Sequence, residues 1–142
     1  MRDDSTLDPA MIQAYRETHY RVVGSPEYTL RVGHYSEALQ HAHRLHEVTC
    51  SAYVTAYNPY SVTKTEAENV RLQQALEQEL LDRKLVFQRG FGQHPANGWP
   101  AEPSVLIFGL NLDAAKELGR RFEQNALIWN GADAIPYLVL LR

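Results

Sequence analysis

Alternating apolar and polar positions, together with short runs of β-branched and aromatic residues, predict seven strands along the chain. We expect them at residues 20–23, 28–32, 49–57, 85–88, 104–109, 126–129 and 137–141. The segment 49–57 is almost wholly apolar and rich in Val, Thr and Tyr, which is typical of a strand covered on both faces. We therefore predict that this strand lies inside the sheet and ends at Asn58-Pro59, because proline cannot continue an interior ladder.

Apolar residues at helical spacing predict three main helices between these strands. Ser36 caps one that ends near residue 47, Thr65 and Glu68 form a capping box for one that runs to about residue 84, and Asn111 or Asp113 caps the third. The resulting order is β-β-α-β-α-β-β-α-β-β. It predicts an α+β domain with one mixed β-sheet and about three helices packed on it.

Two further segments fall outside this main pattern. Pro9 favours a short helix over residues 9–15, because proline suits the first turn of a helix. Residues 89–103 contain three Gly and three Pro, which predicts a long loop. Loops of about 15 residues are uncommon in compact domains and are often functional or mobile.

The length of 142 residues fits one domain, which we expect at residues 9–142 after a disordered N-terminus at residues 1–8. The polar start leads into no apolar segment, so no secretory signal is predicted. No apolar run approaches the roughly 18–20 residues that cross a bilayer. These features predict a cytoplasmic protein without a membrane partner.

Charge argues against a nucleic-acid partner. The chain has 14 Lys and Arg against 17 Asp and Glu, for a net charge of −3, and it lacks the basic character of nucleic-acid-binding domains. The single cysteine, Cys50, excludes a disulfide within the monomer and a cysteine-rich zinc site. The oligomeric state is not determined by these features.

None of the strong catalytic or nucleotide-binding motifs is present. Arg89-Gly90-Phe91-Gly92 contains an isolated G-x-G pattern, which a flexible loop explains better than a phosphate cradle. His41, His43 and His46 share one predicted helix, but no spacing in the chain supplies a further ligand for a metal. We therefore predict no metal site and no cofactor.

Two asparagines are candidates for a polar site. Asn58 closes the apolar segment 49–57, and Asn69 lies three residues before Leu72, on the apolar side of its helix. A buried amide without a hydrogen bond costs about 1–3 kcal/mol, so Asn69 needs a partner. It either ties down the turn at residues 58–63 or reaches a ligand at the end of the strand.

A second polar cluster precedes an apolar strand. Glu102 lies between Pro100 and Pro103, and these rigid residues fix its direction. A carboxylate at the end of a strand can have a raised pKa and act as a general acid or base. A salt bridge or hydrogen bonds to backbone amides are the structural alternative. Ser104 adds a hydroxyl at the same strand end.

A third cluster, Gln124 and Asn125, falls where a helix passes into a strand. Amide side chains at such positions often satisfy backbone groups of caps and turns. Gln124 can equally contact a ligand.

These clusters together carry a resemblance to a known family. The relevant segments are Thr55-Ala56-Tyr57-Asn58-Pro59, Glu68-Asn69, Trp99-Pro100, Glu102-Pro103-Ser104, Gly109-Leu110, Phe122 and Gln124-Asn125-Ala126. In this combination the chain resembles a bacterial family catalogued as domain of unknown function 3293, over roughly residues 15–142. The resemblance implies a single intact domain and brings no activity with it.

The sequence therefore favours a small-molecule or nucleotide-binding domain with a polar pocket at one rim of the sheet. The predicted ligand-binding residues are Asn58, Asn69, Glu102, Ser104, Gln124 and Asn125. Neutral amides orient ligands and rarely catalyse, which favours binding over turnover. One alternative is an enzyme that uses Glu102 as general acid or base. Another is a protein-interaction or regulatory module, for which the eight tyrosines and two tryptophans would supply contacts.

Overall fold

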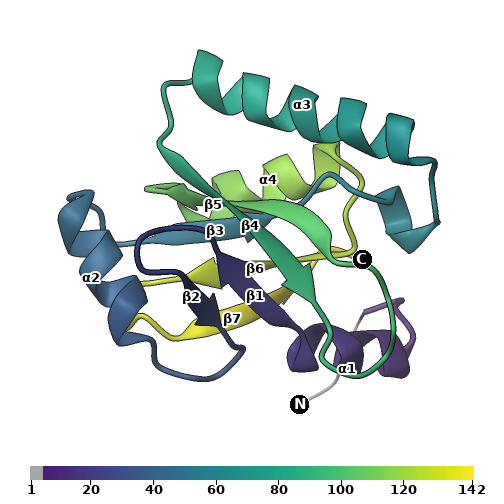
Figure 1. The fold of residues 1–142 in the computed structure, drawn as a ribbon, viewed down its shortest axis with the longest axis horizontal. Coiled ribbons are helices and arrows are strands. Elements are labelled where there is room, and N and C mark those ends of the chain that lie inside the picture. Colours follow the sequence, from purple (N-terminus) through teal and green to yellow (C-terminus); the bar gives the residue numbers. More distant parts are fainter. Residues whose placement is uncertain (1–4) are drawn as a thin grey trace.

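The computed structural model describes residues 5–142, which contain four helices and seven strands (Figure 1). The helices are α1 (Pro9–Glu17), α2 (Glu37–Leu45), α3 (Glu66–Asp82) and α4 (Leu112–Arg121). The strands are β1 (His19–Val22), β2 (Tyr28–Leu30), β3 (Ser51–Val54), β4 (Phe87–Gln93), β5 (Glu102–Phe108), β6 (Ala126–Asn130) and β7 (Pro136–Leu140), and a short 3-10 helix, η1 (Pro59–Ser61), follows β3.

The strands form one curled sheet in the order β2-β1-β4-β5-β3-β6-β7, and every neighbouring pair is antiparallel. The prediction of a mixed sheet is therefore wrong. The helical crossovers through α3 and α4 do join strands of the same direction, as the alternation of helices and strands suggests. However, β5 lies between β3 and β4, and β3 lies between β5 and β6, so no two parallel strands become neighbours.

The short helix predicted over residues 9–15 is confirmed as α1, which extends over nine residues and makes a fourth helix, so the predicted total of about three is too low. Asp8 caps this helix by accepting the Ala10 N–H at 2.8 Å, and Pro9 occupies its first turn. Of the N-terminal residues 1–8 that the sequence predicts to be disordered, residues 1–4 lie outside the described residues. The Ser5 hydroxyl donates to the Arg142 carbonyl at 2.6 Å.

The predicted interior position of the apolar segment after α2 is confirmed, since β3 lies between β5 and β6 and all four of its residues are buried. The strand ends at Val54, earlier than predicted. Beyond Val54, side-chain oxygens instead of a neighbouring strand accept the backbone N–H groups. The Ala56 N–H donates to Gln73 Oε1 at 3.0 Å, and the Tyr57 N–H donates to the Thr55 hydroxyl at 3.0 Å.

The predicted loop at residues 89–103 is strand at residues 89–93 and 102–103, which corrects the interpretation of the G-x-G pattern as part of a flexible loop. Both glycines of the G-x-G pattern, Gly90 and Gly92, lie in β4, which pairs with β1 and β5. Only the hairpin at residues 94–101 is irregular. A Cβ at Gly90 would lie 2.0 Å from the Arg21 carbonyl oxygen. Glycine is therefore required here for the close approach of β1 and β4.

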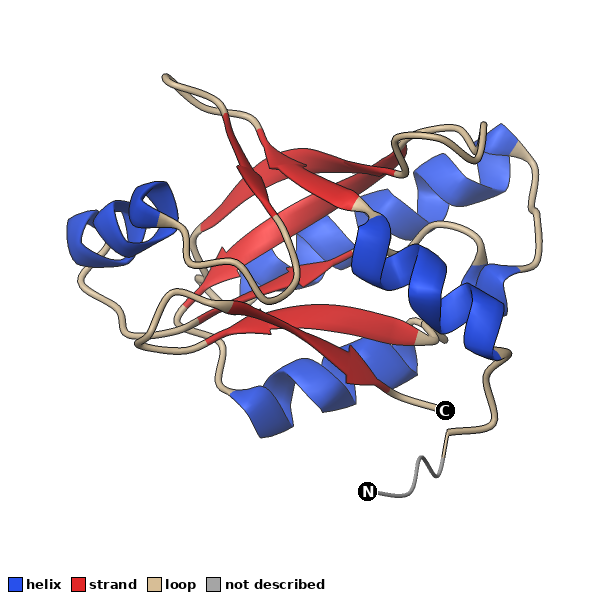
Figure 2. Cartoon of the chain, turned by 90° about the horizontal axis from the view of Figure 1, so that it is seen from below, coloured by secondary structure: helices blue, strands red, loops and turns tan. Residues whose placement is uncertain are grey.

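Two hydrophobic clusters cover the two faces of the sheet, as alternating strand positions dictate. The first face carries Ala52, Val54, Val105 and Ile107, which pack against α3 and α4. The second face carries Tyr20, Val22, Tyr53, Leu106 and Ile128, and α2 packs there through Leu39 and Ala42. Figure 2 shows helices on both sides of the curled sheet.

Candidate functional site

A cavity of about 570 Å³ lies on the second face of the sheet, where β3 ends and β5 begins. Its walls come from α1, the N-terminal end of α3, the turn around η1, the hairpin at residues 94–101 and all strands except β2. This volume is within the range of about 300–1,000 Å³ that is usual for small-molecule sites. Five of the six residues predicted to bind a ligand line it: Asn58, Asn69, Glu102, Ser104 and Gln124.

Asn58 and Asn69 hold the turn that follows β3. Asn58 has a left-handed backbone (φ 46°), a conformation that asparagine adopts more readily than most residues. Its N–H donates to Asn69 Oδ1 at 2.8 Å, and Asn69 Nδ2 donates back to Asn58 Oδ1 at 2.9 Å. The buried Asn69 therefore ties down this turn, which is one of the two roles that the sequence allows. A ligand contact by Asn69 stays a prediction.

Glu102 is a half-buried charged group of the cavity lining. It begins β5 opposite Gly92 of β4, and the Asn58 Nδ2 donates to its Oε2 at 2.9 Å. Within residues 5–142, its Oε1 accepts no hydrogen bond and no Lys, Arg or His forms an ion pair with it. Burial raises the pKa of this carboxyl, and the hydrogen bond from Asn58 offsets part of that effect. The predicted alternative of a salt bridge is absent from the described chain.

Three tyrosines, Tyr20, Tyr53 and Tyr57, line the same cavity as Glu102. The rings of Tyr20 and Tyr53 meet edge to face, with centroids 5.3 Å apart. Burial raises the pKa of Tyr20 and of Tyr57, and the negative charge of Glu102 adds to the effect on both. Both phenols therefore stay neutral at physiological pH.

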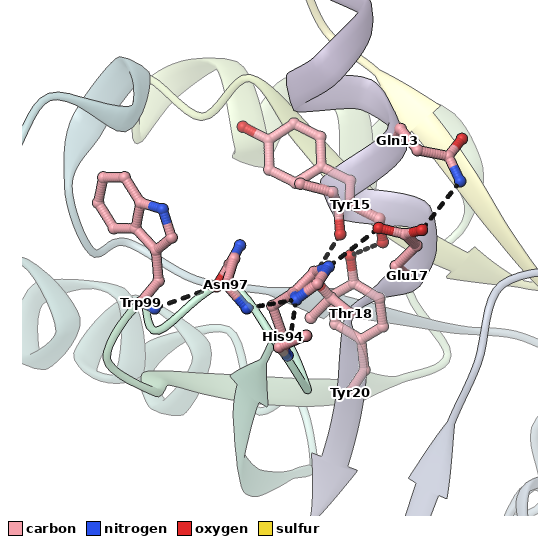
Figure 3. Close-up of polar contacts among 10 residues, drawn as sticks. Gln13, Tyr15, Glu17, Thr18, Tyr20, His94, Asn97 and Trp99 are labelled. Atoms are coloured by element: carbon pink, nitrogen blue, oxygen red, sulfur yellow. Dashed lines mark hydrogen bonds and ion pairs between the residues drawn. The ribbon is translucent and has the colours of Figure 1, made fainter.

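A clasp between α1 and the 94–101 hairpin bounds one side of the cavity (Figure 3). His94 Nδ1 accepts the N–H groups of Ala96 and Asn97, both at 3.0 Å, so its Nε2 must carry the proton that is donated to Glu17 Oε1 at 3.0 Å. This hydrogen bond lowers the pKa of Glu17, as does a second one from Gln13. The clasp fixes α1 over the end of the sheet.

Trp99 follows this clasp in the hairpin. Its backbone N–H donates to Asn97 Oδ1 at 3.0 Å, and Figure 3 shows its indole ring pointing away from His94. The side chain is 56% exposed while it also lines the cavity. Trp99 therefore has an aromatic face available at the mouth of the cavity.

The remaining predicted residues take supporting positions. The Ser104 hydroxyl donates to the Glu102 carbonyl at 3.0 Å, and Gln124 Nε2 donates to the Tyr57 carbonyl at 3.2 Å. Asn125 does not line the cavity. Its Nδ2 donates to the Ser61 hydroxyl at 2.9 Å, so it holds the η1 turn from behind.

Sequence reasoning missed the contribution of α1 and of the tyrosines. Met11, Ala14 and Tyr15 line the cavity from α1, and no local signal in the sequence brings this helix to the end of β5. Tyr20 could have been found, because it shares with Val22 the inward face of an alternating strand.

The described chain offers neither a metal cluster nor a membrane span. Within residues 5–142, no group of three or more His, Cys, Asp or Glu side chains is placed to hold a metal ion. None of the helices in this part of the chain is both long and apolar enough to cross a bilayer.

Comparison with known proteins gives a family and no activity. Residues 54–127 match the model of a family described as protein of unknown function (DUF3293). No curated protein and no solved structure matches the chain. The matched segment contains all six predicted site residues, whereas α1 lies outside it. The chain belongs to this family of proteins of unknown function, DUF3293.

Proposed function

We propose that this domain binds a small organic molecule in the cavity beneath α1. Asn58, Asn69, Glu102, Ser104 and Gln124 would form its polar side, and Asn125 would support it from behind. The observation that carries the proposal is the state of Glu102. Glu102 lines a cavity of about 570 Å³, its Oε1 has no hydrogen-bond partner among residues 5–142, and burial raises the pKa of the carboxyl.

Such an arrangement is costly for a purely structural carboxylate. A charged group that loses water is normally paired or neutralised. Asn58 compensates only one of the two carboxylate oxygens. A ligand that reaches Oε1 would complete the set of hydrogen bonds.

A thermal-shift screen against amino acids, amines, nucleotides, sugar phosphates and neutral aromatics tests this function. A ligand at about 100 times its dissociation constant stabilises the fold by about 2.7 kcal/mol, which raises Tm by several degrees. The blocking variant is Ala14→Trp, because Ala14 faces the cavity from α1. The matched control is Arg16→Trp, which places the same ring on the exposed side of that helix.

We expect at least one compound to stabilise the wild type and Arg16→Trp but not Ala14→Trp. The proposed function would be wrong if no compound in the panel raised Tm, or if every hit still bound to folded Ala14→Trp. The second result would place binding outside this cavity.

Catalysis with Glu102 as general acid or base is a second candidate function. The raised pKa of this carboxyl favours it, because proton transfer is most efficient when the pKa of the group lies near the working pH. The test is to incubate each screened ligand with the wild type and with Glu102→Gln and to follow it by proton NMR. Conversion that needs Glu102 supports an enzyme, and unchanged ligand spectra support binding alone.

A further inference from the structure

Four hydroxyl groups of the cavity lining have already donated their protons to the protein. The Tyr20, Tyr53 and Tyr57 hydroxyls donate to the Tyr15 carbonyl (2.6 Å), the Arg21 carbonyl (2.8 Å) and Glu66 Oε1 (3.0 Å), respectively. The Ser104 hydroxyl likewise donates to a carbonyl. Carbonyl and carboxylate oxygens can only accept, so these hydroxyls offer a ligand lone pairs and no proton.

The amide of Gln124 is oriented in the same way. Its Nε2 donates to the carbonyls of Tyr57 and Phe122, both at 3.2 Å. Its Oε1 accepts no hydrogen bond within the described chain, like Oε1 of Glu102. These groups therefore present hydrogen-bond acceptors, and a ligand that binds to them must supply donors.

The charged side chains of the lining also favour a ligand that brings hydrogen-bond donors and positive charge. Three carboxylates line the cavity, from Asp8, Glu66 and Glu102, against one ammonium group, that of Lys64. Lys64, Asp8 and Glu66 are all exposed, whereas Glu102 is half-buried. His94 Nδ1 accepts two backbone N–H groups and so carries no proton. A phosphate or carboxylate ligand would meet net negative charge here, which argues against a nucleotide.

Aromatic rings complete the complementarity. Tyr15, Tyr20, Tyr53, Tyr57 and Trp99 all line the cavity. An organic cation gains from the negative face of such rings as well as from a carboxylate. A neutral donor would gain only the hydrogen bonds.

We propose that the ligand is a small organic cation, an ammonium or amidinium group on an apolar body. Its N–H groups donate to Oε1 of Glu102 and Oε1 of Gln124, and its apolar part packs against the tyrosines and Trp99. This inference rests on the proposed function, because it names the ligand class for the same cavity.

Benzamidine, benzamide and benzoate form a matched set for the test, since they share a planar shape and differ in charge. Their affinities are measured by titration calorimetry at about pH 8 for the wild type, Glu102→Gln and Glu68→Gln. Glu68 is exposed on α3 and lies outside the cavity lining, so its variant makes the same change of charge elsewhere. Circular dichroism confirms that each variant is folded.

We expect the wild type to bind benzamidine at least about tenfold more tightly than benzamide, the size expected for a hydrogen bond to a charged group. Glu102→Gln should lose this preference and Glu68→Gln should keep it. The inference is overturned if benzamide or benzoate binds as tightly, or if Glu102→Gln leaves benzamidine binding unchanged.

Failure of the inference can be told apart from failure of the proposed function. A neutral or anionic compound that binds, and that Ala14→Trp excludes, overturns the cationic ligand and leaves the binding function standing. If neither this set nor the wider panel contains a binder, both proposals are wrong.

Discussion

At the scale of the residue, Glu102 gains one hydrogen bond, from Asn58, and loses much of its hydration. If Glu102 has a structural role, its carboxylate should increase the free energy of unfolding. If it is kept for ligand binding, its carboxylate should decrease the free energy of unfolding of the ligand-free protein. The two roles therefore predict opposite effects when the charge is removed.

Glu102→Gln should be more stable than the wild type at about pH 8, by about 1 kcal/mol. The glutamine oxygen still accepts from Asn58, but no charge is buried. The raised pKa means that the folded wild type keeps its proton above pH 4.5, the ordinary value, while the unfolded chain releases it. Wild-type stability is thus lost as the pH rises through the raised pKa, and the advantage of the variant grows over the same interval.

Urea unfolding at about pH 4 and about pH 8 measures this difference, with Glu68→Gln as the matched loss of charge. A variant that is less stable than the wild type at about pH 8 would show that Glu102 stabilises the fold.

His43 predicts a pH effect of the opposite sign. This residue of α2 is 4% exposed, and its Nε2 lies 2.7 Å from the Ser51 hydroxyl. Burial lowers its pKa below the ordinary value of 6.5, so the unfolded chain takes up the proton first as the pH falls. The fold should lose on the order of 1 kcal/mol below about pH 6.5, and His43→Gln should lose less.

The measurement is the free energy of unfolding between about pH 7.5 and about pH 5. His41→Gln, an exposed position on the same helix, serves as control and should follow the wild type. Equal pH slopes for His43→Gln and the wild type would contradict the assignment.

At the scale of the element, the sequence predicts the strands by pattern but misjudges β4. Its glycines at positions 90 and 92 look like loop residues because glycine has low strand propensity. Tertiary pairing with β1 and β5 overrides that propensity, and no local signal reveals it. The end of β3 is misjudged for a related reason. The apolar pattern continues beyond Val54, but the next backbone N–H groups donate to the side chains of Gln73 and Thr55 instead of to a neighbouring strand.

Polar positions were easier to predict than their partners. Asn58 and Asn69 stand out because amides interrupt an apolar strand end and an apolar helix stripe. Their contact across 11 residues depends on how the turn after β3 folds back onto α3, and the link from Asn58 to Glu102 depends on how β3 and β5 pair. The sequence shows neither arrangement.

The two glycines of β4 give a direct test of the strand pairing. Gly90→Ala should destabilise the fold by about 2–3 kcal/mol, because the added Cβ would lie 2.0 Å from the Arg21 carbonyl oxygen. Gly92→Ala should change the stability by less than about 0.5 kcal/mol, because its Cβ would lie 3.6 Å from the Tyr20 ring. Urea unfolding of both variants checks this, and equal losses would mean that β1 and β4 do not approach as described.

At the scale of the whole molecule, the second face of the sheet is covered by two separate helices. α2 packs on it through Leu39 and Ala42, whereas α1 borders the cavity with Ala10, Met11 and Ala14. Figure 1 shows α1 beside the end of β1. The position of α1 depends on contacts such as the clasp from His94 to Glu17.

His94→Ala should loosen the wall of the cavity without unfolding the core. It removes the donor to Glu17 and the acceptor of the Ala96 and Asn97 N–H groups. We expect faster amide hydrogen exchange in α1 and in residues 94–101, with β3 and β5 unchanged. Exchange measured by mass spectrometry tests this. Uniform acceleration throughout the chain would instead indicate global destabilisation.

The most direct test of the central claim is a titration of the ¹⁵N-labelled wild type with benzamidine, followed by two-dimensional NMR. The account predicts saturable shifts at the backbone of Glu102, the side-chain amide of Gln124 and the indole N–H of Trp99, all of which line the cavity. Spectra that do not change, or shifts confined to residues away from the cavity, would contradict the claim that this domain holds a small organic cation at Glu102.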